Sequence, residues 1–331
     1  MGRIWPRSQP RRRSLSQPTW PDRRLSEVHK VKIRSLSPGT RHPYRVRSTA
    51  LLEFDPDEVT FGDTVSSDTF AFTTLSSNAE SISVVVMNGI HERDEILTSL
   101  VRLAADRAYD LVFLNGDILE HVEDQQQIID HVLAPCTEIF ASQTAFIYVR
   151  GNHEARGRFA RMLPDYIGMP GDRYYYAFTH GPVRVIVLDG GENGEDTAEV
   201  YAGLADFDRY RDAQRDWLIQ EIWSDAFRKA PFRVVVVHMP PGASGHGPND
   251  MHRKWTPVLN EGKLDLMICA HKHRYDIVEP KEGVRDYPMV IGGGPKPGAP
   301  ALIRVDATIA SLDVTMTTDD GEVVGTYSIT R

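Results

Sequence analysis

Short apolar runs recur along the chain from residue 81 onward, and stretches with helical spacing separate them. The runs are rich in Val, Ile and Leu at successive positions, which is typical of strands that are buried on both faces. They predict strands at residues 84–87, 111–114, 146–149, 183–188, 234–237 and 266–269. Apolar residues three and four positions apart predict helices at residues 93–107, 124–142 and 210–227. Strands that alternate with helices in this way predict an α/β domain.

The C-terminal region has a different pattern. Polar and apolar residues alternate over 301–305, 309–317 and 322–329, and an Asp-Asp-Gly turn occupies 319–321. A period of two predicts antiparallel strands, which here would complete a second sheet. We therefore expect a single domain over residues 81–331.

The first 75 residues divide into two segments. Residues 1–26 are rich in Arg, Pro and Ser without hydrophobic periodicity, which predicts a disordered basic tail. Residues 27–75 contain alternating stretches, and the runs HKVKIRSLSPGTRHPYRV and FAFTT resemble the later strands of a fibronectin type III-like domain. A complete domain of that class needs about seven strands. Only three or four are found here, so we expect a partial β-sandwich segment in front of the main domain.

Composition and charge exclude some classes of function. The chain is 41% hydrophobic and 25% charged, as in soluble globular proteins, and no run of about 18 apolar residues predicts a membrane span. The net charge is −8, yet residues 1–50 contain 13 basic residues against two acids. Because these arginines are scattered among Pro and Ser without a nucleic-acid-binding fold, we expect no nucleic-acid partner. The oligomeric state is left open.

The N-terminus and the cysteines say little about the compartment. No apolar stretch follows the basic N-terminal residues, so no secretory signal is present in the sequence as given. A cytoplasmic location is the default expectation, and an extracytoplasmic one would follow if the N-terminus is incomplete. Cys136 and Cys269 lie in apolar patterns, which predicts core thiols.

Residue types that bind metal ions follow five of the predicted strands. The carboxyl ends of strands in open α/β sheets are where ligand sites assemble, and His, Asp and Asn are ligands for divalent transition metals. The five ends lead into Asn88-Gly89-Ile90-His91-Glu92, Asn115-Gly116-Asp117, Arg150-Gly151-Asn152-His153-Glu154, His238, and Ala270-His271-Lys272-His273. One histidine after a strand is more often a core or turn residue. Five such ends in one chain favour a metal site over a structural coincidence.

The order of these motifs resembles that of the calcineurin-like metallophosphoesterases, which include purple acid phosphatases. That family carries Asp-x-His, Gly-Asp, Gly-Asn-His-Glu, a strand-end histidine and Gly-His-x-His, and the similar region here covers residues 82–294. The fibronectin-like segment makes the chain most similar to the purple acid phosphatase branch. The resemblance implies a four-layer αββα sandwich that binds two metal ions (Mn, Fe or Zn).

The resemblance also implies roles for individual side chains. The metal ligands would be His91, Asp117, Asn152, His238, His271 and His273. Asp117 would bridge both ions, His91 and His273 would complete the first site, and the remaining three would form the second. His153 would act as a general acid or donate a hydrogen bond to phosphate. The implied reaction is hydrolysis of phosphate mono- or diesters by attack of a hydroxide that bridges the metals.

This sequence departs from the family pattern at three positions. Ala270 replaces a glycine, which is a small change. Glu120 stands where purple enzymes have a tyrosine ligand, so the tyrosinate-to-iron colour is not expected. Gly89 stands where the family has an aspartate ligand of the first metal, and glycine supplies no ligand. The alternative hypothesis is therefore a catalytically impaired protein of the same fold that acts as a binding or structural module.

Other motifs favour ordinary structural roles. His246 and His252 lie in a segment rich in Gly, Pro and Asn, at 242–256, which predicts a loop near the site. The glycines at 292–294 fit no phosphate-binding loop pattern and predict a turn. A third hypothesis, binding of nucleic acid through the basic tail, predicts an affinity that depends strongly on salt.

Overall fold

Two six-stranded β-sheets stack face to face in the computed structural model, which describes residues 28, 30–55 and 57–331. The predicted disordered tail, residues 1–26, lies outside the described residues. The first sheet has the order β16 (Val323–Thr330), β15 (Ser311–Thr318), β14 (Ala301–Thr308), β5 (Ser81–Met87), β6 (Leu111–Asn115) and β7 (Ala145–Val149). The second has the order β12 (Asp276–Val278), β13 (Met289–Ile291), β11 (Leu266–Cys269), β10 (Phe232–Val236), β9 (Val183–Val187) and β8 (Tyr176–His180).

Each sheet has a parallel part and an antiparallel part. The strands β5, β6 and β7 are parallel neighbours in the first sheet, and β9, β10, β11 and β13 are parallel in the second. The C-terminal strands β14, β15 and β16 pair antiparallel and extend the first sheet from β5. The alternating pattern after residue 301 predicted antiparallel strands correctly, but they extend the sheet of β5 to β7 instead of completing the other one.

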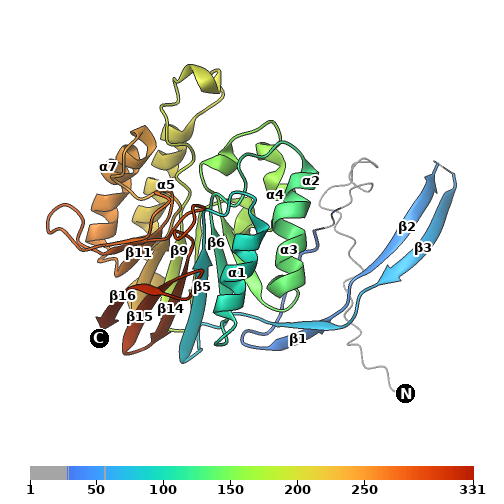
Figure 1. Cartoon of the computed structure of the whole chain (residues 1–331), viewed down its shortest axis with the longest axis horizontal. Helices are drawn as coiled ribbons and strands as arrows, with labels where there is room; N and C mark the ends of the chain where they lie inside the picture. Colours follow the sequence, from blue (N-terminus) through green and yellow to red (C-terminus); the bar gives the residue numbers. More distant parts are fainter. Residues whose placement is uncertain (1–27, 29, 56) are drawn as a thin grey trace.

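Helices cover the outer face of each sheet (Figure 1). They are α1 (Asp94–Ala104), α2 (Gln125–Ile128), α3 (Ala134–Cys136), α4 (Leu163–Tyr166), α5 (Phe207–Ile222), α6 (Asp225–Lys229) and α7 (His246–Glu261). The π-helical turn Ile129–Leu133 joins α2 to α3, and a second one, Thr137–Ala141, extends this helical stretch beyond α3. Single 3-10 turns lie at His153–Ala155, Ala160–Met162, Pro170–Asp172 and Glu199–Tyr201.

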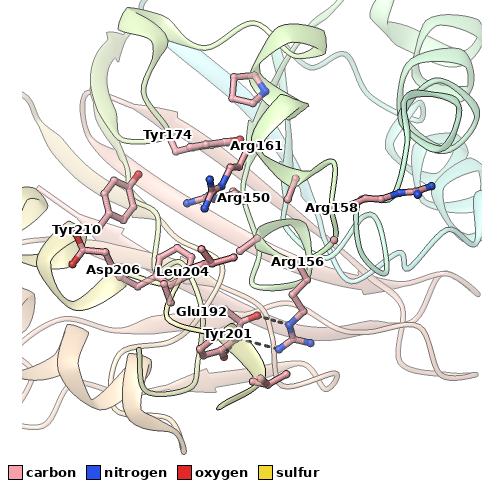
Figure 2. A pocket seen from close by; sticks show the side chains of 17 residues that line it. Arg150, Arg156, Arg158, Arg161, Tyr174, Glu192, Tyr201, Leu204, Asp206 and Tyr210 are labelled. Atoms are coloured by element: carbon pink, nitrogen blue, oxygen red, sulfur yellow. Dashed lines mark hydrogen bonds and ion pairs between the residues drawn. The ribbon is translucent and has the colours of Figure 1, made fainter. Parts of the chain in front are cut away.

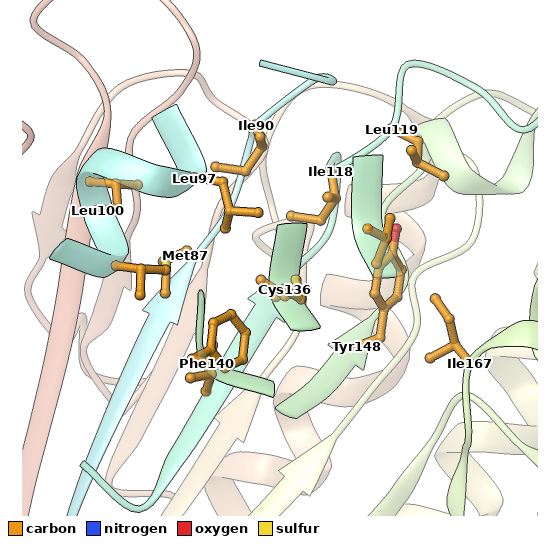
Figure 3. Close-up of a cluster of buried hydrophobic side chains, with 14 of the residues drawn as sticks. Met87, Ile90, Leu97, Leu100, Ile118, Leu119, Cys136, Phe140, Tyr148 and Ile167 are labelled. Atoms are coloured by element: carbon orange, nitrogen blue, oxygen red, sulfur yellow. The ribbon is translucent and has the colours of Figure 1, made fainter. Parts of the chain in front are cut away.

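The strand side chains alternate between two apolar layers, as their uniform apolar runs predict. From β5, Val84 and Val86 enter the layer between the two sheets, whereas Val85 and Met87 face the helices α1 to α3. Figure 3 shows this outer layer, where Met87 lies with Leu97, Leu100, Cys136 and Phe140. A third layer packs the second sheet against α5 and α7. The two sheets and the helices on their outer faces therefore form the predicted four-layer αββα arrangement, and an apolar layer separates each pair of neighbouring layers.

The helix α7 corrects the interpretation of residues 242–256 as a loop. It begins at His246, after Gly245, whose φ is 117°. Its first residues, His-Gly-Pro-Asn-Asp, have no apolar periodicity, which hid the helix in the sequence. The apolar stripe starts only at Met251 and continues through Trp255, Val258 and Leu259, which are all buried.

The N-terminal segment does not confirm the expected fibronectin-like sandwich. Its strands β1 (Arg41–Tyr44) and β4 (Phe70–Thr73) form one two-stranded sheet, and β2 (Arg47–Phe54) and β3 (Val59–Ser66) form another. The β2–β3 hairpin extends away from the main domain (Figure 1), and Leu52, Phe61 and Val65 on it are 63–71% exposed. Within the described part of residues 27–75, apolar side chains are too few and too exposed to form a core between sheets.

No helix within the described residues has the length and apolar character needed to cross a bilayer.

Candidate metal centre

Side chains from both sheets meet beyond the carboxyl ends of the parallel strands. His91 follows β5, Asp117 follows β6, Asn152 and His153 follow β7, His238 follows β10, and His271 and His273 follow β11. Parallel strands end at the same edge of a sheet, so these loops lie side by side. Side-chain contacts, including the ring contact of His238 with His271, connect these seven residues, which are the seven that the sequence predicted for the site.

Asp117 lies at the centre of the group. Its Oδ2 is 3.0 Å from His238 Nε2 and 3.8 Å from His91 Nε2, so one oxygen faces ligands of both predicted metal sites. Its Oδ1 accepts a hydrogen bond from the backbone N–H of His153, at 3.3 Å. Burial opposes ionisation of Asp117, but the positive charges of the neighbouring histidines outweigh it and hold the pKa of this carboxyl well below its usual range.

The histidine His238 has its tautomer fixed by a backbone group. Its Nδ1 lies 2.8 Å from the carbonyl oxygen of Asn115, which can only accept, so Nδ1 donates. The other nitrogen, Nε2, is buried, faces Asp117 and makes no hydrogen bond. Burial disfavours the imidazolium, yet the negative charge of Asp117 and the hydrogen bond to the carbonyl of Asn115 raise the pKa of His238 overall. A buried nitrogen that faces a carboxylate without a hydrogen bond suits a shared cation.

Three further histidines face their partners through ring nitrogens. His91 Nε2 and His273 Nε2 are 3.0 Å apart, and His271 Nδ1 is 2.9 Å from Asn152 Oδ1. Burial and neighbouring histidines lower the pKa of His273, and they lower the pKa of His271 to about 4. His271 is therefore neutral at neutral pH, with a lone pair available to a metal ion.

The donor sets fit two metal ions. Of the three candidate ligand groups within the described residues, two share Asp117: one consists of His91, Asp117 and His273, and the other of Asp117, His238 and His271; the third consists of His91, Glu120 and His153. Within each group the ligand atoms lie within 4.8 Å of one another. Imidazole and carboxylate ligands of this kind suit Mn, Fe or Zn, so the residues present are compatible with the dinuclear centre that the sequence predicted.

Several of these residues have a strained backbone. His91, Asp117, His271 and His273 all have positive φ, between 50° and 70°. Each such non-glycine residue costs roughly 1–3 kcal/mol and persists only where surrounding structure enforces it. Strain of this kind concentrated on adjacent loops is typical of functional sites.

The side chain of Glu154 holds the loop of Asp117 in this conformation, a role that was not predicted from the sequence. The fully buried carboxylate accepts backbone hydrogen bonds from Asp117 (3.0 Å), Ile118 (2.7 Å) and Leu119 (3.0 Å). It also accepts from the backbone of Gly151 (2.8 Å) and from the hydroxyl of Tyr148 (2.9 Å). The signal that could have identified it is its place in Gly151-Asn152-His153-Glu154, directly after two candidate site residues.

Gly89 lies against a second glycine segment. Its φ is +59°, and a Cβ at this position would stand 3.2 Å from Gly294 Cα and 3.3 Å from the carbonyl oxygen of Gly293. Gly294 in turn has no room for a side chain, because its own Cβ would stand 2.4 Å from His273 Cα. The predicted turn at 292–294 is therefore a close backbone approach that supports the first metal group.

Neither neighbour of Gly89 replaces the missing aspartate. Asn88 turns its amide to the carbonyl oxygen of Gly293, at 2.7 Å. Glu92 accepts hydrogen bonds from the backbone of Glu120 and from the side chain of Gln127. Both side chains are engaged in structural contacts.

Glu120 approaches the site from its open side. Its Oε1 lies 3.1 Å from His91 Nδ1, and its Oε2 lies 3.5 Å from His153 Nδ1. Its carbonyl oxygen accepts a hydrogen bond from His153 Nδ1 at 2.7 Å. The other ring nitrogen of His153, Nε2, takes no part in this contact. The rings of His91 and His153 stand edge to face with centroids 4.8 Å apart.

The two histidines on α7 do not join this group. His246 Nε2 pairs with Asp208 at 2.7 Å, and His252 Nδ1 is 3.2 Å from the hydroxyl of Thr256. Within the described residues, neither histidine belongs to a group of side chains that could hold a metal ion.

The calcineurin-like phosphoesterase family matches the chain over residues 82–275, which is more than half of its length. The chain belongs to this family. The matched region contains His91, Asp117, Asn152, His238, His271 and His273. The predicted family is thereby confirmed, and with it the α/β metallophosphatase fold.

Curated relatives of this calcineurin-like phosphoesterase include acid phosphatases. Purple acid phosphatase 21 of Arabidopsis thaliana is 22% identical over 270 residues, covering 77% of this chain and 54% of that protein. Acid phosphatase type 7 of Mus musculus is 23% identical over 278 residues, covering 78% and 58%. The chain spans 21% to 58% of the length of the curated relatives it matches.

A solved purple acid phosphatase shares the fold of this chain. The purple acid phosphatase PPD1 from yellow lupin (Lupinus luteus) seeds superposes with a TM-score of 0.65 and 15% sequence identity. The match covers 90% of this chain and 61% of that chain. At this identity the likeness concerns the fold.

Proposed function

We propose that this calcineurin-like phosphoesterase hydrolyses phosphate mono- or diesters at a dinuclear metal centre. The observation that carries the proposal is that two ligand groups converge on Asp117, one through His91 and His273 and one through His238 and His271. His91, Asp117 and His273 would hold the first metal, and Asn152 would join the second group through its contact with His271. When bound, the metal pair would activate a water molecule as nucleophile and neutralise charge on the phosphate oxygens.

The protein's own side chains prepare the site for an anion. Backbone bonds to Glu154 hold the Asp117 loop in its strained conformation. The carbonyl of Asn115 directs His238 Nε2 toward Asp117. His153, whose side chain is 23% exposed, is fixed through Nδ1 and presents Nε2 to the open side of the centre. As an imidazolium it would donate the Nε2 proton to a phosphate oxygen or to the departing alcohol.

Two substitutions test these roles separately. The assay is metal analysis of the purified chain combined with hydrolysis of p-nitrophenyl phosphate and bis(p-nitrophenyl) phosphate. His153→Asn should lower kcat by about 10²–10⁴-fold with unchanged metal content, since it removes a proton donor. Asp117→Asn should lower both metal content and turnover. If the native chain holds metal and hydrolyses neither ester, the proposed activity is wrong.

Gly89 supports a second candidate, a chain with an impaired first site that acts as a binding or structural module. Its neighbours Asn88 and Glu92 supply no replacement ligand. This alternative requires one tightly bound metal per chain and no turnover. The metal analysis and the two esters above distinguish it from the proposed enzyme.

A further inference from the structure

A large cavity is lined in part by the loop that carries Asn152 and His153. Its volume is about 1120 Å³, and ligand pockets commonly enclose some 300–1,000 Å³. We call it the arginine–tyrosine pocket. Its walls come from the segment that follows β7, from Tyr174 and from the loop that precedes α5 (Figure 2). The side chains that characterise it are Arg150, Arg156, Arg161, Tyr174, Tyr201 and Tyr210.

The pocket and the metal centre share one loop. Arg150 and Arg156, which line the pocket, flank the candidate site residues Asn152 and His153 in the sequence. The pKa of Arg156 is raised chiefly by its hydrogen bonds to Glu192, and the charge of Asp117 adds to the shift. Arg156 is therefore within electrostatic reach of the centre. Ala155, the last residue of the 3-10 turn that begins at His153, also lines the pocket, so the organic part of a phosphoester held at the metals would lie next to this cavity.

Two of the arginines form a rigid wall. Arg150 donates two hydrogen bonds to Asp189 Oδ2, at 3.0 and 2.6 Å, and its guanidinium stands 4.0 Å from the centre of the Tyr174 ring. Figure 2 shows Arg150 between Tyr174 and Tyr210, and Tyr210 also bonds Asp189. Arg156 pairs with Glu192. Flat aromatic and guanidinium faces held in place in this way suit the face of an aromatic ring.

The remaining lining leaves charge and apolar surface uncovered. Arg161 is exposed and makes no ion pair within the described residues. Val200 and Leu204 line the same cavity and are 83% and 73% exposed. Arg150, Arg156 and Arg158 are paired with Asp189, Glu192 and Glu123, so Arg161 is the arginine of the lining that leaves a positive charge uncompensated. An anionic ligand with a flat apolar part complements both features.

We propose that the arginine–tyrosine pocket binds the aromatic part of an aromatic phosphate ester, such as a nucleoside monophosphate. The inference rests on the proposed function, because the phosphate of the same molecule lies at the metal centre. Arg161 and the apolar rim at Val200 and Leu204 cover the ring, and Arg150 and Arg156 form the wall behind it.

Matched substrates isolate the contribution of the ring. In AMP and ribose 5-phosphate the scissile bond is the same and only AMP carries a base; benzyl phosphate and ethyl phosphate differ likewise by a phenyl group. For the metal-loaded chain we expect kcat/KM to be at least about tenfold higher for the aromatic member of each pair, mainly through KM. Leu204→Glu should abolish this preference and leave ribose 5-phosphate within about threefold of the native value.

A control variant and a binding measurement make the result decisive. Ile309→Glu changes a similarly exposed apolar residue, which lies in the β14–β15 turn and is 70% exposed. It should leave the ratio of kcat/KM values within both substrate pairs unchanged. Binding of adenosine to the metal-loaded chain, measured by calorimetry, should be lost in Leu204→Glu but retained in Ile309→Glu. The proposed role of the pocket would be wrong if kcat/KM were equal within both pairs. It would also be wrong if adenosine did not bind, or bound equally well to the native chain and to Leu204→Glu. Either result would leave the proposed function intact. Adenosine binding that depends on Leu204 without hydrolysis of any ester would overturn the proposed function and retain the pocket.

Discussion

Gly89→Asp restores the side chain that the family carries at the first metal site, and it should strengthen metal binding while it weakens the metal-free fold. The change places a carboxylate within the loop that carries His91. It also places a Cβ on a backbone with φ of +59°, facing Gly294 Cα at 3.2 Å. The two effects have opposite signs and can be measured separately.

The destabilisation follows from the backbone and from the contact. A left-handed residue costs about 1–2 kcal/mol, and Asp tolerates this conformation better than most residues. Gly294 cannot move freely toward the site, since it already packs against the backbone of His273. We expect the free energy of unfolding of the metal-free chain to fall by about 1–2 kcal/mol, which lowers Tm by roughly 2–8 °C for a domain of this size.

The gain comes from the added anionic ligand. Loss of a partner that merely supports a metal ligand weakens affinity about 10–100-fold, so a direct ligand should be worth at least about tenfold, or about 1.4 kcal/mol. Competition with a chelator, using Mn²⁺ and Zn²⁺, measures the Kd of the weaker site. Turnover of p-nitrophenyl phosphate at low metal concentration should rise with it.

Gly89→Ala is the matched control, because it introduces the same Cβ without a ligand. It should lower Tm at least as much as Gly89→Asp, because Ala tolerates the left-handed conformation less well, and it should leave metal binding unchanged or weaker. The reasoning about position 89 is refuted if the Gly89→Asp and Gly89→Ala variants bind the metal with the same Kd. It is also refuted if the native chain already holds two metals tightly and Gly89→Asp lowers turnover.

Three further predictions concern the surroundings of the centre. Glu154→Gln places an amide against backbone donors and should lower the free energy of unfolding by about 1–3 kcal/mol in urea titrations; equal stability would show that its five hydrogen bonds do not hold the loop. Glu120→Gln removes the negative charge 3.1 Å from His91 Nδ1 and should raise the Kd of the lower-affinity metal site about 10–100-fold in the chelator assay. An unchanged Kd would show that Glu120 does not contribute to metal binding. Burial raises the pKa of Asp250, but hydrogen bonds led by the one from Arg211 outweigh this and lower it below 3.8. The stabilisation by Asp250 is therefore present above about pH 4 and is lost as the pH falls through its folded pKa, so Asp250→Asn should be less sensitive to acid than the native chain in urea titrations between about pH 5 and pH 2.

The sequence was sufficient to predict the strands and the convergence of the site. Buried parallel strands are apolar at every position, so the runs before Asp117 and His238 were unambiguous, and the parallel arrangement brings their ends together. The alternating C-terminal strands were also recognisable, although the sheet they join depends on the long-range pairing of β14 with β5. Local patterns contain no information about such a pairing.

Contacts between distant segments explain the features that the sequence did not reveal. The role of Glu154 depends on the loop after β6 lying within reach of its carboxylate. The arginine–tyrosine pocket combines Arg150 with Tyr210, 60 positions later in the chain. The helix α7 was not predicted, because its first turn is polar and follows a glycine. The fibronectin-like interpretation relied on strand alternation, which a hairpin such as β2–β3 produces equally well.

The most direct test of the dinuclear centre is the number of metal ions bound per chain in the native protein and in Asp117→Asn. Titration of the metal-free chain with Mn²⁺ or Zn²⁺ should reveal two sites, the weaker being the one beside Gly89. Asp117→Asn should weaken both sites together, because Asp117 belongs to both ligand groups. Binding of no more than one ion by the native chain, or two sites that Asp117→Asn leaves unchanged, would contradict the account.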